Sequence, residues 1–397
     1  MNRENVREFL REAFEDIGGY ARRLTKLIKQ AFIGLIGLNE EIEKQCKIVV
    51  DCDGGDKAPK AIIKGIKTAI NKGFVNPEEI LVIGTEDSID QLRQQGRLFR
   101  LFNYLGQKNK FSQKIAKTLQ GFNFFIDVLA QVNVLVCNEA IEMDDDRQQI
   151  IRKRNSSAMA LGIKLIKKQQ ADALVSAGNT AGMVILGSSI LGRYTPNLKP
   201  AIAVPLPNDS GPCLLLDSGA IHRATPQDLL NCAIMGSTYA KNMWNIERPT
   251  VRLLNIGSEK GKGNEDLKLA QEILENNQQI NYCGNIEGDK IFVEPAHVIV
   301  CSGEIGNNTI KVAEGVVNLV KEKMGWFWTI ISLFWNHHKR ADHKEIGGSI
   351  LLGVMGTLII AHGKSDSLSI ANAIRRAKQE IVRGVSKQIP EQLSKVL

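Results

Sequence analysis

The sequence has no long apolar run and no closely spaced cysteine pair, and both absences narrow what this chain can be. No apolar stretch approaches the roughly 18 residues of a membrane-spanning helix, and the first residues do not form a secretory signal peptide. The seven cysteines contain no CxxC pair. Because several of them lie in apolar, strand-like runs, we expect buried free thiols in a reducing cytoplasm and no disulfide framework.

Composition and charge favour a globular protein with an anionic partner. The chain has 397 residues, enough for one large core or two lobes, and its 43% apolar and 24% charged residues are typical of soluble domains. The net charge of +8 favours phosphate, an acidic protein or a membrane surface as partner. We expect no nucleic-acid partner, since no recognition motif for nucleic acid is present.

Short apolar runs that end in small polar turns recur along the chain, and helical patterns such as 60–71 and 226–244 follow them. Strands that alternate with helices predict an α/β fold, a mostly parallel sheet with helices on both faces. Ligands of such sheets bind beyond the carboxyl ends of the strands. The turns expected to line that edge follow Val50, Ile83, Val175, Leu216 and Val300.

The stretch 173–182 gives this pattern most clearly. An apolar run ends in Ser176, and Gly178, Asn179 and Thr180 lead into an apolar helical pattern. Free backbone N–H groups and the helix dipole at such a helix start favour an anion, so we expect phosphate binding by these four residues. An ordinary capped turn is the alternative.

Two basic segments lie outside this pattern. Residues 1–46 read as an N-terminal helical extension with a basic amphipathic part, which suits a membrane interface or packing on the protein itself. Residues 97–126 contain six basic and seven aromatic residues but no acidic one. This insertion suits lipid headgroups, an acidic protein or nucleic acid, and a solvated helical face is the alternative. The basic residues 152–154 before Ser156 and Ser157 suit a phosphate or a carrier protein.

Residues 325–335 hold three of the four tryptophans. As a helix this run is roughly 17 Å long, too short for the ~30 Å hydrocarbon core. Beside the basic residues 339–344 it predicts an interfacial anchor on an anionic membrane, and a dimer or core contact is the alternative. The residues expected to contact the membrane are Trp326, Phe327, Trp328, Phe334 and Trp335. His337, His338 and His343 do not form a metal site, because no carboxylate or cysteine completes the set.

From about residue 47 to 382, the succession of motifs resembles the phosphate acyltransferase family of bacterial phospholipid synthesis, the acyl-ACP:phosphate acyltransferases. Its turn residues are Asp51, Gly54, Gly55, Asp56, Ser156, Ser157 and Asp217. The further matches are 58–59, 142–145, 176–180, 215–220, 247–249, 255–257, 262–265, 284–288, 313–315, 347–348, 352–353, 361–363 and 372–375.

The resemblance implies a fold like that of isocitrate and isopropylmalate dehydrogenases with a protruding helical hairpin. It implies a homodimer in the cytoplasm, associated peripherally with the inner face of the membrane. The catalytic domain would span 47–390, interrupted by the insertion at 97–126, and the hairpin would occupy 318–345 as a possible membrane anchor. No metal and no cofactor are implied.

The reaction implied is transfer of a long-chain acyl group from acyl carrier protein to inorganic phosphate, giving acyl phosphate for phosphatidic acid synthesis. On this resemblance Asn285 and Asn307 would donate to the oxyanion. Lys262 and His362 would neutralise charge or protonate the departing thiolate. Turn capping is the alternative role for each of these residues.

Several turns depart from the family pattern, at Asp53, Asn155, Ile221, Ser302 and Glu304. These departures favour the main alternative, a weakly active or non-catalytic membrane-associated scaffold that binds acyl carrier protein. A nicotinamide-dependent dehydrogenase is disfavoured, because no Gly-x-Gly-x-x-Gly fingerprint and no carboxylate trio for a metal are present.

Overall fold

The computed structural model describes residues 46–92, 132–324 and 347–394. The N-terminal extension, the insertion at 97–126 and the aromatic run at 325–335 lie outside these residues, apart from Cys46. The described chain divides into two compact units within the region predicted as one catalytic domain. Unit 1 runs to Asn179 and takes up Ala361–Lys378 again, and unit 2 holds Thr180–Ile360 and the residues from Gln379 onward.

Unit 1 is built on four parallel strands in the order β3-β2-β1-β4. Its strands are β1 (Ile48–Asp51), β2 (Ile80–Thr85), β3 (Asn133–Cys137) and β4 (Ala173–Ser176). Its helices are α2 (Lys60–Asn71), η1 (Pro77–Glu79), α5 (Arg147–Arg152), η3 (Lys153–Asn155), α6 (Ala158–Lys167) and the first part of α13 (Ser367–Arg383).

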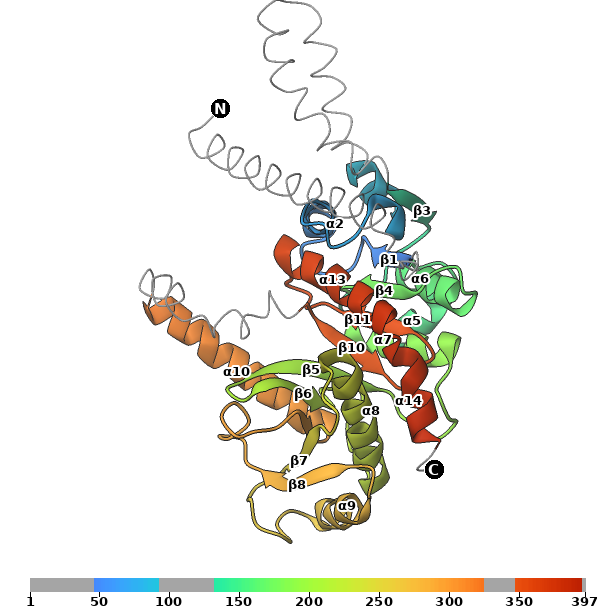
Figure 1. The fold of residues 1–397 in the computed structure, drawn as a ribbon. Coiled ribbons are helices and arrows are strands. Elements are labelled where there is room, and N and C mark those ends of the chain that lie inside the picture. The colour runs from blue at the N-terminus through green and yellow to red at the C-terminus, as the bar shows by residue number, and fades with distance from the viewer. Residues whose placement is uncertain (1–45, 93–131, 325–346, 395–397) are drawn as a thin grey trace, which may run out of the picture. The chain divides into compact units, whose positions relative to one another are not determined.

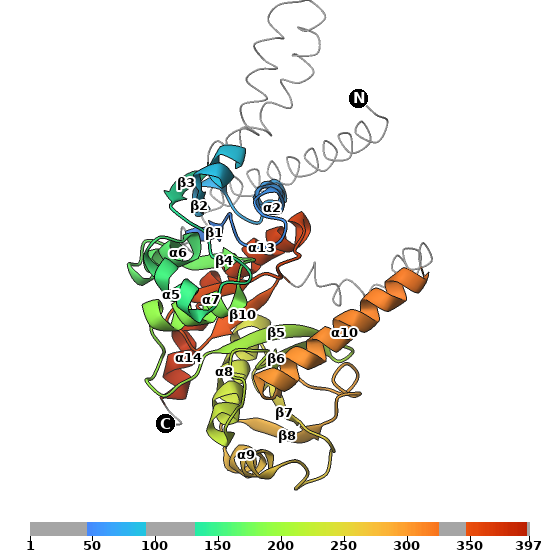
Figure 2. The same cartoon turned by 180° about the vertical axis from the view of Figure 1, so that it is seen from behind.

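The strand order of unit 1 places helices on both faces of its sheet, as predicted. The chain moves one way from β1 to β2 through α2 and the opposite way from β3 to β4 through α6. Since parallel crossovers are right-handed, the two helices must lie on opposite faces. Figures 1 and 2 show α2 and α13 on one face and α6 on the other.

Edge strand β3 departs from the prediction that the strands are covered on both faces. Four of its five residues are exposed, although three of them are apolar. An edge strand has a neighbour on one side only, and an apolar sequence cannot reveal that position. Strand β1, which has a neighbour on each side within unit 1, is fully buried as expected.

Unit 2 has seven strands in the order β11-β10-β5-β6-β9-β7-β8. These are β5 (Ala201–Asn208), β6 (Gly211–Leu216), β7 (Thr250–Leu254), β8 (Asn281–Ile286), β9 (Val298–Val300), β10 (Ser349–Leu352) and β11 (Thr357–Ile360). Its helices are α7 (Thr180–Leu186), η4 (Gly187–Leu191), α8 (Pro226–Trp244), α9 (Glu265–Asn276), α10 (Gly303–Met324), the last part of α13 and α14 (Val385–Leu393).

Two antiparallel pairs, β5–β6 and β10–β11, consist of consecutive strands joined by short connections. Strands β5 and β6 form a hairpin in which Asn208 faces Gly211, whose φ of 133° is one that L side chains rarely adopt. Strand β10 is antiparallel to both β11 and β5. The pairs among β6, β9, β7 and β8 are parallel. The prediction of a mostly parallel α/β sheet is therefore confirmed.

Local sequence signals set both ends of helix α8 in unit 2. Helix α8 starts at Pro226 after Thr225, whose side chain accepts from the backbone N–H of Asp228 and which forms a capping box with Asp228. It ends at Trp244, where Asn245 adopts a left-handed conformation. In the part of the chain that the structure describes, no helix has both the length and the apolarity required to cross a membrane.

Candidate functional site

In unit 1 the turns after β1 and β4 are joined by a buried hydrogen-bond chain. The Ser176 hydroxyl donates to the Asp51 carboxylate over 2.7 Å and accepts from the Gly178 backbone N–H over 3.0 Å. At Gly54 an added Cβ would lie 2.7 Å from the Gly178 nitrogen and 2.8 Å from the Ser176 hydroxyl oxygen. These turns can approach so closely only because residue 54 has no side chain.

The Asp51 carboxyl is a buried titratable group. It also accepts from the Asp53 backbone N–H at 3.1 Å, and it is 4% exposed. Burial raises its pKa from 3.8 to about 6, and the hydrogen bond from Ser176 opposes that rise. Asp51 therefore acts on the turn through Ser176 and is not an exposed substrate contact.

A third turn of unit 1, residues 361–365, joins the first two. The Ala361 N–H donates to the Ser176 carbonyl at 2.9 Å, and the Asp56 N–H donates to the Gly363 carbonyl at 2.9 Å. At Gly55, whose φ is +103°, a Cβ would approach the Gly363 carbonyl. Three turns thus meet in one unit: the predicted turns at 51–56 and 176–179, and the turn at 361–365, whose first residues are a match to the family pattern.

His362 lies in this third turn and is exposed. Its Nδ1 accepts from the Lys364 backbone N–H at 3.1 Å. In the neutral imidazole one nitrogen accepts and the other carries the proton, so the neutral ring holds its proton on Nε2. The neutral His362 ring can therefore donate a hydrogen bond from Nε2.

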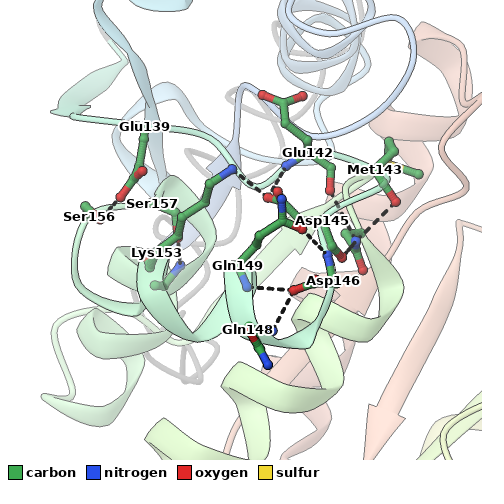
Figure 3. A network of polar contacts seen from close by, with 12 residues as sticks. Glu139, Glu142, Met143, Asp145, Asp146, Gln148, Gln149, Lys153, Ser156 and Ser157 are labelled. Carbon is green, nitrogen blue, oxygen red and sulfur yellow. Dashed lines mark hydrogen bonds and ion pairs between the residues drawn. The ribbon is translucent and has the colours of Figure 1, made fainter.

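Asn179 differs from the expectation of an exposed turn donor. It is 7% exposed, and its amide nitrogen donates to the carbonyls of Glu142, Met143 and Asp145 over 3.1–3.2 Å. Figure 3 shows these three residues with the network around them. Because its donors are engaged, Asn179 clamps the 142–145 loop to the turn, and the prediction that it stands exposed was wrong.

The same network accounts for Ser156 and Ser157 (Figure 3). Ser157 is fully buried and is the N-cap of α6, accepting from the Ala160 N–H and donating to the Lys153 carbonyl. The Ser156 hydroxyl donates to Glu139. Ser157 therefore cannot touch a phosphate or a carrier protein, because its hydroxyl caps a helix inside the unit.

Asp53, noted in the sequence only as a departure, holds the β1 turn to the neighbouring strand. It accepts from the Thr85 backbone N–H at 2.8 Å and from the Thr85 hydroxyl at 3.0 Å. The thiol of Cys137, at the end of β3, also donates to it at 3.8 Å. The one signal for this role was an acidic residue two positions after a strand end.

In unit 2 the buried carboxylate of Asp217 binds backbone N–H groups. Its carboxylate accepts from the Ile202 N–H at 2.6 Å and from the Ile221 N–H at 2.5 Å, and the residue is fully buried. Burial raises its pKa, which its backbone donors oppose. Asp217 shapes the turn 217–221 and has no exposed surface for a substrate.

Asn285 and Lys262 lie on connected segments of unit 2, but Asn285 is not in a turn. It belongs to strand β8, is 2% exposed, and its amide donates to the Glu259 carbonyl at 3.0 Å while its oxygen accepts from the Tyr282 hydroxyl. Asn255 donates to the Lys262 carbonyl at 2.9 Å. Two asparagines thus hold the 255–264 loop, on which Lys262 is exposed.

Asn307 was also expected in a turn, and it lies in the second turn of α10. The helix starts at Gly303, whose N–H donates to the Ile221 carbonyl at 2.8 Å. A side chain at Gly303 or Gly306 would collide with Asp217. These glycines therefore serve close packing of a helix end, which the sequence alone does not distinguish from a turn.

Besides the turns, the candidate groups for chemistry in the described ranges are the possible metal ligands and the cysteines. No group of three or more His, Cys, Asp or Glu side chains suited to a metal ion occurs in residues 46–92, 132–324 and 347–394. All seven cysteines are free thiols, and six of them are buried. The expectation of buried free thiols is confirmed for all except Cys283.

Comparison with known proteins agrees with the resemblance seen in the sequence. A family model described as "Fatty acid synthesis protein" matches residues 101–388. A phosphate acyltransferase of Dictyoglomus turgidum is 33% identical over 362 residues, covering 88% of this chain and 98% of that protein. One from Desulfitobacterium hafniense strain DCB-2 is 34% identical over 87% of this chain and 97% of its own length.

Solved structures with a similar fold are more distant in sequence. A phosphotransacetylase from Streptococcus pyogenes has a TM-score of 0.53 at 16% identity, covering 89% of this chain and 99% of that one. A branched-chain phosphotransacylase from Enterococcus faecalis has a TM-score of 0.50 at 14% identity, covering 84% and 99%. These likenesses show the fold alone. The identity and coverage of the curated relatives show that this chain belongs to the phosphate acyltransferase family.

Proposed function

We propose that this chain transfers a long-chain acyl group from acyl carrier protein to inorganic phosphate, releasing acyl phosphate and the free carrier thiol. As a member of the phosphate acyltransferase family the chain is an acyltransferase. The observation that carries the proposal is the similarity to phosphate acyltransferases along nearly their whole length. It does not favour the scaffold alternative.

Phosphate binding is proposed for the turn 176–180. Phosphate is itself an anionic nucleophile, so the protein has to hold and orient it against the thioester carbonyl. The structure supports a division of roles, in which Ser176 and Asn179 shape the turn because their polar groups are already engaged. The exposed Thr180 hydroxyl and the backbone N–H groups at the start of α7 are then the proposed donors to phosphate.

Stabilisation of the leaving group is proposed for His362. An oxygen of hydrogen phosphate bonds to the acyl carbon, the carbon–sulfur bond breaks, and the carrier thiolate leaves with the electron pair and takes up the proton that the phosphate loses. The neutral His362 ring would stabilise that thiolate by a hydrogen bond from its Nε2–H group, because Nδ1 is occupied as an acceptor. The bond from Ala361 to the Ser176 carbonyl ties the histidine's turn to the proposed phosphate turn within unit 1.

The unit 2 residues are assigned supporting roles in the same proposal. Lys262 is exposed and would neutralise negative charge, and Asn285 holds the loop that carries it. Asn307, half-buried in the second turn of α10, remains a proposed oxyanion donor. Substitution of Lys262 by Gln should lower kcat with acyl carrier protein as donor and leave the fold intact, since the side chain is exposed.

The test is turnover by the purified chain with palmitoyl carrier protein and phosphate. Hydroxylamine trapping should detect acyl phosphate in amounts equal to the carrier thiol released, and omission of phosphate should abolish both. Carrier binding without turnover would instead support the scaffold alternative.

We also propose the finer features that the family implies. These are a fold like that of isocitrate and isopropylmalate dehydrogenases and a homodimer in the cytoplasm. A helical hairpin over 318–345 would bind peripherally to the inner face of the membrane. The exposed apolar side chains of helix α10 support the proposal of a further binding surface on this helix. They are Ile305, Val312, Val316, Val317 and Leu319. A triple variant in which Trp326, Trp328 and Trp335 become Ser should lose co-sedimentation with anionic liposomes and keep acyl transfer. Wild-type sedimentation by that variant would contradict the anchor.

A further inference from the structure

A row of basic side chains lies on unit 1, on η3, the end of α5 and one face of α6. We name it the basic ridge; its members are Arg152, Arg154, Lys164, Lys167 and Lys168. Residues 164, 167 and 168 are spaced i, i+3 and i+4 at the C-terminal end of α6, so their side chains share one face. All members except the half-buried Lys164 are exposed.

The ridge keeps like charges close together. The Lys164 ammonium reaches back to the Asn155 side-chain oxygen at 2.6 Å, which brings the end of α6 towards η3. Burial lowers the pKa of Lys164, and the charges of Arg154 and Lys168 lower it further. A partner with several negative charges along a similar length would offset the repulsion among these positive charges.

Acidic side chains near the ridge in the sequence already bind other groups of unit 1. Asp145 pairs with Lys153 at 2.6 Å, Asp146 caps α5 through the N–H groups of Gln148 and Gln149, and Glu139 accepts from Ser156. In the portion of the chain that the structure describes, Lys167 and Lys168 make no ion pair.

The ridge adjoins the turn proposed to bind phosphate. Lys153, beside Arg152 and Arg154, pairs with Asp145, whose carbonyl accepts from the Asn179 side chain at 3.2 Å (Figure 3). A partner on the ridge is therefore held within the same unit as residues 176–179 of that turn. Helix α6 is about 15 Å long and separates Arg154, on η3 before its start, from Lys167 and Lys168 at its C-terminal end. The ridge therefore has a length that suits a protein surface better than one phosphate group.

We propose that the basic ridge is the docking surface for an acidic face of the acyl carrier protein. This inference rests on the proposed function, which supplies a carrier-bound substrate, and it names the surface that receives the carrier. Docking here would hold the carrier beside the phosphate turn while its thioester arm reaches the reacting groups. Charge complementarity of this kind raises the association rate and fixes orientation.

The test compares the double variant Lys167→Glu/Lys168→Glu with the control Lys241→Glu/Lys387→Glu. The control lysines are exposed residues of unit 2 and give the same change in net charge. We expect the ridge variant to raise the Kd for carrier protein, measured by calorimetry, at least tenfold. Its KM for palmitoyl carrier protein should rise in parallel, while its KM for phosphate and its rate with palmitoyl-coenzyme A stay within twofold of wild type.

Other outcomes overturn the docking surface. An unchanged Kd, an equal loss in the control, or a loss confined to binding of anionic liposomes or single-stranded RNA would each contradict it. Circular dichroism checks folding, and Lys167→Ala/Lys168→Ala should give a smaller loss in the same direction. Carrier binding that depends on the ridge in a protein that makes no acyl phosphate would refute the proposed function and leave the docking surface standing.

Discussion

Replacement of Asn179 by Ala separates a structural clamp from a direct phosphate ligand. The buried amide of Asn179 donates to three loop carbonyls, of Glu142, Met143 and Asp145. An amide nitrogen has two hydrogens, so at most two of these contacts are strong at once. At about 1 kcal/mol net per hydrogen bond, with a further cost for buried carbonyls left unpaired, we expect a loss of about 2 kcal/mol in stability.

The assay combines chemical denaturation with hydrogen exchange. Asn179→Ala should lower the free energy of unfolding and speed amide exchange in residues 142–146, and it should raise the KM for phosphate because the turn loses its shape. Asn179→Asp should be more damaging, since a carboxylate would face three carbonyl oxygens.

Asn208 offers a matched control in unit 2. Its side-chain amide donates to the carbonyls of Ile291 and Glu294 at 3.0 and 2.8 Å. Asn208→Ala should cost similar stability without a change in the KM for phosphate. If Asn179→Ala keeps wild-type stability and exchange but still raises that KM, Asn179 is a phosphate ligand and the clamp is refuted.

Two further predictions concern the turns of unit 1, and a third concerns the metal dependence of the reaction. Gly54→Ala should lower both activity and stability, because the added methyl group forces the Gly178 N–H away at a cost of roughly 1–3 kcal/mol. Gly288→Ala is the control, since a methyl group there would meet open space, and enzyme assays and melting curves should show no loss. The Asp51 carboxyl binds its proton more tightly folded, at a pKa of about 6, than at its ordinary 3.8, so its contribution to stability falls by about 3 kcal/mol as pH rises from 4 to above 6. The unfolding free energy of wild type minus Asp51→Asn should fall over that range, and a flat or rising difference would contradict this. Acyl phosphate formation should survive EDTA; loss of turnover that Mg²⁺ or Zn²⁺ restores would refute the expectation.

The sequence predicted helix bounds well where the residues that start and end a helix lie next to it in the chain. Helices α2 and α8 begin and end at the predicted residues, and α8 does so because Thr225, Pro226 and Asp228 form its start. Apolar runs located the ends of five strands: β1, β2, β4, β6 and β9 end within two residues of Val50, Ile83, Val175, Leu216 and Val300.

The roles of the polar residues were harder to predict because their partners lie far away in the sequence. Asn179 is occupied by carbonyls more than 30 residues earlier, and Asn285 by a carbonyl 26 residues earlier. A sequence shows that an asparagine follows or ends a strand, but it does not show which backbone groups reach its amide. The sequence therefore located the turns after β1 and β4, whereas strand β2 continues through the turn predicted after Ile83. The turn at 361–365 and the division into clamps and exposed donors required the structure.

The most direct test of the central claim is stoichiometry in a single reaction of the purified chain. Palmitoyl carrier protein and ¹⁸O-labelled phosphate are supplied, and the acyl phosphate and the free carrier thiol are quantified together. The account predicts equal amounts of both, with phosphate-derived ¹⁸O retained in the acyl phosphate. Thiol release with free fatty acid and no acyl phosphate, or no thiol release at all, would contradict it.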